Sequence, residues 1–270
     1  MFQRILAFFS FVLLIAVIII GVLHWNNKLD VTAKETGETA QTTNVAAGKE
    51  DTAADRRINR VELGNFVEDL PENIANLFKD AWDQEEQVDI AIVGSPSLGS
   101  EKAGWGGLVK DKLEALYGPD FVQVTIHTFD GTSTQFLEDG LADIAAEQPS
   151  IVLLESFSLE DNSGLVGIET SEENIQTIID TFVSENPSVG VILLPPNPIH
   201  GAKNYPVEVA QMKEFAAAEG IPYLDHWTSW PDPDTDEIVE YLGEDSLPNE
   251  KGHALWAEAV VNYFTSGSEE

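Results

Sequence analysis

Two segments about 150 residues apart carry the residue types that acyl transfer requires. The first is the turn after the apolar run 88–93, where Ser95 and Ser97 follow a glycine. The second is the stretch 247–257, in which His253 lies near the start of the amphipathic run 250–264. A serine hydroxyl attacks an acyl carbon when a base such as an imidazole removes its proton. This pattern predicts a hydrolytic or acyl-transfer site if the fold brings the two segments together.

Other polar and aromatic residues follow the apolar runs further along the chain. His226 lies directly after the run 221–225 and is a second candidate base. Tryptophan and asparagine side chains in such loops commonly line sugar or acyl pockets, although buried tryptophans are more often part of the core. The candidates for substrate binding are Trp105, Asn197 and Trp227.

The motifs around these residues resemble those of the SGNH/GDSL hydrolase superfamily over roughly residues 86–266. That family opens with a strand and Gly-Asp-Ser, and it closes with Asp-x-x-His-Pro-Asn-x-x-Gly-His. Here the corresponding stretches read Gly94-Ser95-Pro96-Ser97 and Leu247-Pro248-Asn249, followed by Gly252-His253. Gly104-Trp105-Gly106 resembles the Gly-Trp that begins the first helix in many relatives.

The chain departs from the family pattern at two catalytic positions. Pro96 stands where the nucleophile belongs, and Leu247 stands where the catalytic histidine belongs. A shift of one residue makes Ser97 or Ser95 the nucleophile. His253 or His226 is then the base.

The resemblance also implies an oxyanion hole. It assigns one donor to the backbone N–H of Gly131, since a glycine that opens a helix exposes N–H groups. It assigns a second donor to the amide of Asn162, in the place of the family's Gly-x-Asn-Asp block. The alternatives are an ordinary helix cap at Asp130 or Thr132 and an ordinary turn at Asn162.

Apolar runs and amphipathic runs alternate from residue 88 onward, which is typical of a parallel sheet with crossover helices. The expected fold class is α/β, with a three-layer α/β/α arrangement and a five-stranded parallel sheet as in SGNH and flavodoxin-like proteins. The five expected strands are 88–93, 121–126, 150–154, 189–194 and 221–225. The expected helices are 61–82 with a break at Pro71, then 103–117, 134–147, 171–185, 205–219 and 250–264.

The N-terminus carries a membrane signal. Residues 5–23 contain no charge and are about 28 Å long as a helix, enough to cross a bilayer core. We predict one uncleaved transmembrane helix in an anchor of residues 1–25, a disordered linker over 26–57 and an extracellular domain over 58–270. The alternative is a cleaved signal peptide with a site near Val31-Thr32-Ala33.

The composition excludes several functions. The formal net charge of −33 falls on residues 58–270, because the acidic and basic residues before them balance. Such a surface repels nucleic acid and other polyanions. The absence of cysteine excludes thiol nucleophiles and cysteine-based zinc sites, and no metal or cofactor is expected.

The leading functional expectation is a membrane-anchored acyl-ester hydrolase with a serine nucleophile at the outer membrane face. Its substrates would be small O-acyl groups, such as acetyl, on envelope glycans or lipids. The alternatives are a catalytically eroded protein that binds a glycan or an envelope partner, and an O-acyltransferase. The family's activity would carry over only if a serine and a base meet at the sheet edge.

Overall fold

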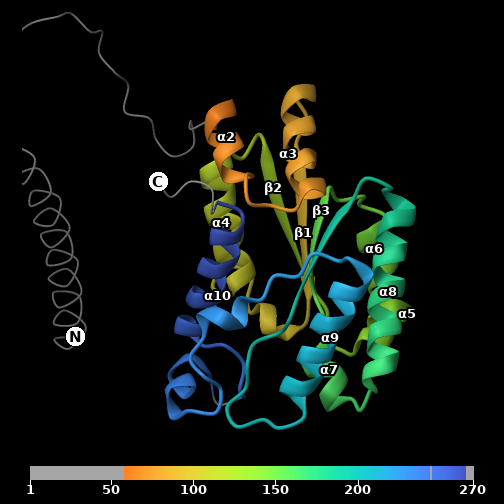
Figure 1. Ribbon diagram of the computed structural model, residues 1–270, viewed down its shortest axis with the longest axis vertical. Helices are drawn as coiled ribbons and strands as arrows, with labels where there is room; N and C mark the ends of the chain where they lie inside the picture. Colours follow the sequence, from red (N-terminus) through yellow and green to blue (C-terminus); the bar gives the residue numbers. More distant parts are fainter. Residues whose placement is uncertain (1–57, 244, 266–270) are drawn as a thin grey trace, which may run out of the picture. The chain divides into compact units, whose positions relative to one another are not determined.

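Four parallel strands form the sheet of the computed structural model, which describes residues 58–243 and 245–265 (Figure 1). The strands are β1 (Val88–Gly94), β2 (Val122–Thr128), β3 (Ile151–Glu155) and β4 (Gly190–Leu194), and their spatial order is β2-β1-β3-β4. Ile90 of β1 lies opposite Val124 of β2 and Ile151 of β3. Parallel strands of this kind are joined by crossover helices, so both faces of the sheet are covered.

Helices precede the sheet and connect its strands. The first helices of the described residues are α2 (Arg60–Phe66) and α3 (Glu72–Gln84), and Pro71 stands directly before α3 because its ring cannot continue a helix. The connecting and closing helices are α4 (Trp105–Tyr117), α5 (Ser133–Asp139), α6 (Leu141–Ala145), α7 (Ser158–Ser163), α8 (Ile168–Glu185), α9 (Tyr205–Glu219) and α10 (Glu250–Tyr263). Short 3₁₀ turns are η2 (Pro96–Leu98), η3 (His226–Ser229) and η4 (Asp236–Tyr241).

The side chains of the strands alternate between two hydrophobic clusters, one on each face of the sheet. Ile151 and Leu153 point into the cluster that α2, α3, α4 and α10 cover, whereas Val152 and Leu154 point into the cluster under α5, α6, α8 and α9. Figure 1 shows these two groups of helices on opposite sides of the sheet. The predicted three-layer arrangement is therefore present.

The prediction of a fifth strand over 221–225 was wrong. Only one isolated bridge, between Leu193 and Tyr223, continues the sheet there. The carbonyl of Pro222 accepts from Leu193 N–H and Leu224 N–H donates to Leu193, but Pro222 has no N–H to extend the ladder. From His226 onward the chain coils into η3 and leaves the sheet edge.

The predicted anchor 1–25 and linker 26–57 lie outside the described residues. Within residues 58–243 and 245–265, no helix combines the length and the apolar character needed to cross a bilayer.

Candidate active site

The strand order of the sheet reverses between β1 and β3. The chain leaves β1 toward its neighbour β2 on one side, and it leaves β3 toward β4 on the other. Ligands of open parallel sheets bind at such a reversal of strand order. A functional site is therefore expected among the residues at the ends of β1 and β3.

A buried hydrogen-bonded pair, Ser95 and Glu155, lies at this switch point, at the carboxyl ends of β1 and β3. Oγ of Ser95 donates to Oε2 of Glu155 at 2.6 Å, and the N–H of Ser95 donates to the same oxygen at 2.8 Å. Oε1 of Glu155 accepts from the N–H of Phe157 at 3.1 Å. Gly94 makes this contact possible, because a Cβ at that position would lie 2.6 Å from the Cβ of Glu155.

Burial changes the proton affinity of Glu155. Desolvation raises the pKa of this carboxyl to about 7, although hydrogen bonds from Ser95 and Phe157 act in the opposite direction. The Ser95 and Glu155 side chains are both 0% exposed. A buried carboxyl that changes charge near neutral pH is suited to general acid–base work.

Ser97 lies in the same turn and has a free hydroxyl. It is the second residue of η2, and its N–H donates to Oγ of Ser95 at 3.2 Å. Its own Oγ is buried and has no hydrogen-bond partner. Both serines predicted as nucleophiles therefore stand together at the end of β1, one paired with a carboxylate and one unpaired.

His253 reaches the same region from the first turn of α10. Its ring lies against Gly99, since a Cβ on that glycine would be 2.6 Å from Nε2 of His253. Nδ1 of His253 accepts from the backbone N–H of Trp105 at 3.3 Å, so the neutral ring carries its proton on Nε2. Burial lowers the pKa of His253. In this tautomer Nε2 is a donor, which is the reverse of what a serine's base needs.

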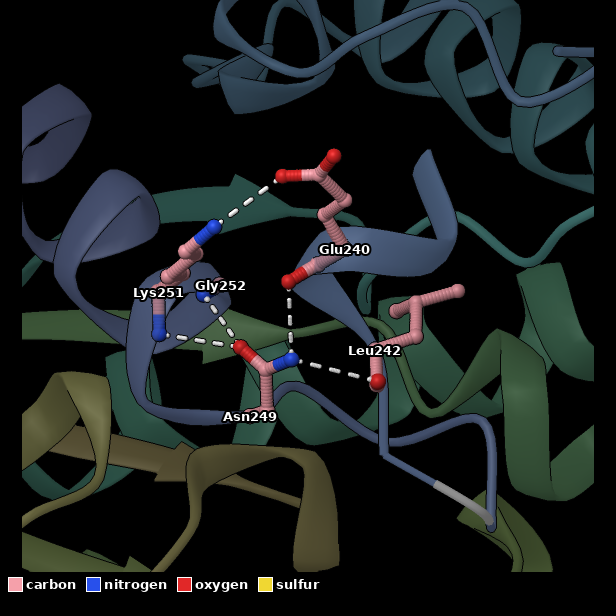
Figure 2. A network of polar contacts seen from close by, with 5 residues as sticks. All are labelled: Glu240, Leu242, Asn249, Lys251 and Gly252. Carbon is pink, nitrogen blue, oxygen red and sulfur yellow. Dashed lines mark hydrogen bonds and ion pairs between the residues drawn. The ribbon is translucent and has the colours of Figure 1, made fainter. Parts of the chain in front are cut away.

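Asn249 fixes the start of α10 and thereby the position of His253. Its Oδ1 accepts from the N–H groups of Lys251 and Gly252, and its Nδ2 donates to the carbonyls of Glu240 and Leu242 (Figure 2). The side chain thus caps the helix and ties it to η4.

His226 lies in the core. Nδ1 accepts from Nε1 of Trp230 at 2.9 Å, and Nε2 donates to the carbonyl of Pro195 at 2.8 Å. The ring stacks on Trp256 with centroids 4.0 Å apart, and Trp256 stacks in turn on Trp105 at 4.6 Å. Burial lowers the pKa of His226 to about 3. Both ring nitrogens are engaged, so none is free for a serine.

The N-terminus of α5, next to Gly131, is already occupied by protein groups. Thr132 caps the helix through the N–H of Gln135, whose side chain accepts from the N–H of Thr132. The N–H of Ser133 donates to Asp161 at 2.7 Å. The cap at Thr132 is therefore confirmed, and the role of Gly131 as an oxyanion donor stays a prediction.

Asp161 is a second buried carboxylate bonded to serine hydroxyls. It accepts from Oγ of Ser133 at 2.7 Å and from Oγ of Ser171 at 2.6 Å, and so joins α5, α7 and α8. Asn174 donates to Oγ of Ser133 at 2.9 Å. Desolvation raises the pKa of Asp161 above its usual range. Both carboxylate oxygens of Asp161 accept hydrogen bonds from the protein, so the role of this network is to hold the three helices together.

The remaining predicted residues bond within the protein. Nδ2 of Asn162 donates to Glu208 at 2.8 Å. Asn197 is buried, donates to the carbonyls of Pro198 and Ser246, and keeps an unpartnered Oδ1. Nε1 of Trp227 donates to Pro196, and Trp105 is fully buried with its Nε1 unpartnered. Their substrate-binding or oxyanion roles stay predictions.

The structure thus gathers Ser95, Ser97, His253 and Trp105 on the face of the sheet covered by α4 and α10. Gly131 and Asn162 belong instead to the α5 and α7 region on the other face. Sequence reasoning missed Glu155. Its signal was an acidic residue that directly follows the apolar run 151–154 and the last printed pair of β1 and β3, Val93 with Leu154.

An open pocket of about 370 Å³ lies away from these serines. It is formed by the chain around η3 and by the C-terminal half of α10, with Tyr223, Asp225, Asn262 and Tyr263 among its lining residues. The part of the chain that the structure describes contains no group of three His, Asp or Glu side chains suited to a metal ion.

The fold and the serine turn define a class: a doubly wound α/β protein with buried serines at the switch point of a parallel sheet. The chain belongs to the GDSL-like lipase/acylhydrolase family, whose model matches residues 90–255. It is therefore a member of a hydrolase family. No curated protein matches the sequence.

Solved structures share the fold at low sequence identity. A G-D-S-L family protein from Desulfitobacterium hafniense has a TM-score of 0.53 and 19% identity, with 66% of this chain and 99% of that chain covered. A GDSL-like lipase from Bacteroides thetaiotaomicron has a TM-score of 0.51 and 13% identity, with 69% of this chain and 96% of that chain covered. The acetylxylan esterase Axe2 from Geobacillus stearothermophilus has a TM-score of 0.50 and 17% identity, with 68% and 95% covered.

Proposed function

We propose that this protein is a serine-dependent hydrolase of small acyl esters, with its nucleophile in the turn after β1. The observation that carries the proposal is the placement of Ser95 and Ser97 at the β1–β3 switch point of a GDSL-like fold. Catalytic hydrogen bonds are often loose before substrate binds, so the unpaired hydroxyl of Ser97 does not argue against it.

Acetyl groups on a neutral envelope glycan or a lipid are the proposed substrates. The acidic surface repels polyanions, which disfavours phosphate-rich polymers as substrates. The shared fold of an acetylxylan esterase makes acetylated glycans the first compounds to test. Transfer of the acyl group to a second glycan hydroxyl would use the same acyl-serine.

The test is esterase activity of the full-length protein in mild detergent. We expect hydrolysis of p-nitrophenyl acetate and covalent labelling by a fluorophosphonate at one serine of the turn, located by peptide mass spectrometry. Ser95→Ala or Ser97→Ala, whichever removes the labelled serine, should lower kcat/KM at least ~100-fold, because the acyl-enzyme cannot form. Ser163→Ala, at an exposed serine of α7, is the matched control. Turnover no faster than that of the double alanine variant, with no adduct, would refute the proposal.

A second candidate is a non-catalytic protein that binds a glycan or envelope partner at the carboxyl edge of the same sheet. It is favoured by the tautomer of His253 and by the two engaged nitrogens of His226. Within residues 58–243 and 245–265, no histidine nitrogen pairs with a serine hydroxyl. Absence of labelling together with glycan binding would select this function.

The proposed location is the outer face of the cell membrane, with the N-terminus in the cytoplasm and a single span before the domain. The uncharged run 5–23 supports this proposal. Protease added to intact protoplasts should release the domain by cutting within 26–57, while a cytoplasmic marker protein stays intact. A domain that is fully protected under these conditions would contradict the orientation.

A further inference from the structure

We propose that Glu155 is the general base of this site and that Ser95 is the nucleophile it activates. The inference rests on the proposed hydrolase function and names the residue that takes the place of the family's histidine. Glu155 ends β3 and reaches across Gly94, so its carboxylate and the hydroxyl of Ser95 meet between the two central strands.

The geometry is that of a nucleophile and its base. The distance of 2.6 Å between Oγ of Ser95 and Oε2 of Glu155 lies within the range expected for such a pair. The base is itself held in place, because Oε2 also accepts from Ser95 N–H and Oε1 accepts from Phe157 N–H. Oγ of Ser95 accepts one hydrogen bond, from Ser97 N–H, so one lone pair remains for attack.

The two histidines do not offer an equivalent arrangement. His226 has both nitrogens engaged with Trp230 and Pro195, and His253 presents N–H rather than a lone pair at Nε2. Leu247 stands at the position where the family pattern has its catalytic histidine. Glu155 is the acceptor that the serine turn does contact.

The reaction balances with these two residues and water. Oγ of Ser95 bonds to the ester carbonyl carbon while its proton passes to Glu155, and the tetrahedral intermediate expels the alcohol, which takes that proton. Water then attacks the acyl-serine and gives its proton to Glu155. The carbon–Oγ bond breaks, Ser95 recovers the proton and the carboxylic acid leaves.

The pair is fully buried, so substrate access requires movement of η2. Leu98 of η2 packs against Gly94, since a Cβ on that glycine would lie 2.5 Å from its Cδ1. The low-polarity surroundings keep Glu155 protonated until near-neutral pH. The titratable groups that interact with it are Glu160 of α7, whose charge also raises the pKa of Glu155, and Tyr205 of α9, whose own pKa lies well above its ordinary value.

The test compares Glu155→Gln with wild type in the full-length protein, using p-nitrophenyl acetate and a fluorophosphonate. We expect kcat to fall at least ~100-fold with KM changed less than about twofold, because Gln keeps the shape but cannot take the proton. Wild-type kcat/KM should rise with pH around 7 as Glu155 ionises, and this limb should be absent in the variant. The wild-type adduct should map to Ser95.

Asp161→Asn is the matched control, because it alters another buried carboxylate bonded to serine hydroxyls. It should lower stability but keep the wild-type pH profile. If Glu155→Gln does not fold, the role of Glu155 is tested instead with Glu155→Asp. The position of the wild-type adduct and the wild-type pH profile then complete the test. Activity within about threefold of wild type, an unchanged pH limb or an adduct on Ser97 would overturn the role of Glu155 and leave the hydrolase proposal standing. An inactive, unlabelled wild type would instead refute the hydrolase proposal.

Discussion

As the pH rises from about 5 to about 8, Glu155→Gln is expected to become more stable relative to wild type by roughly 2–3 kcal/mol. The folded pKa of Glu155 is about 7, above the ordinary 4.5. A raised carboxyl pKa contributes stability that is complete below the unfolded value and is lost as pH rises through the folded value. The loss therefore falls between about pH 4.5 and 7.

Urea unfolding of both proteins at the two pH values measures this effect. Other shifted groups, such as Asp161 and His226, are present in both proteins and cancel in the comparison. Gln also changes the hydrogen bond to Ser95, but that cost does not depend on pH. Parallel stability curves for the two proteins would show that Glu155 does not titrate in this range.

Trp256→Ala is expected to lower the free energy of unfolding by about 3–5 kcal/mol, as for other large-to-small changes of buried aromatic residues. Trp256 is fully buried between Trp105 and His226, so its loss opens a cavity and removes two ring stacks. Chemical unfolding followed by circular dichroism gives the value.

Trp82→Ala is the control for the loss of a tryptophan as such. Trp82 is only partly buried and makes one edge contact with Phe121. Trp82→Ala should therefore lower the free energy of unfolding clearly less than Trp256→Ala does. Equal losses in the two variants would mean that the stacked column of Trp105, Trp256 and His226 adds no special stability.

Periodicity in the sequence predicted most of the fold because strands and helices follow local patterns. The four strands and the helices 205–219 and 250–264 lie within a residue or two of the expected ranges. The predicted helix 134–147 divides at Gly140 into α5 and α6. The fifth strand failed because an apolar run cannot reveal whether its backbone finds a partner, and Pro222 withholds one donor.

The site was less predictable because its pairing depends on register between strands distant in the sequence. The family pattern indicated that a histidine is the base. In the structure, however, the nitrogens of His226 bond to Trp230 and Pro195, and Nδ1 of His253 bonds to Trp105. Glu155 looked like an ordinary residue after a strand. Only the pairing of β1 with β3 brings it beside Ser95, as the hydrogen bonds between the two residues show.

The packing of α10 against α4 has a consequence for how the chain folds. The hydroxyl of Tyr117 donates to the carbonyl of Phe264, which lies 147 residues further along and directly follows α10. Contacts of such long range slow folding, because the entropy of closing the intervening loop is lost before they form. The core beneath α4 is therefore complete only once α10 has been synthesised and has packed against it.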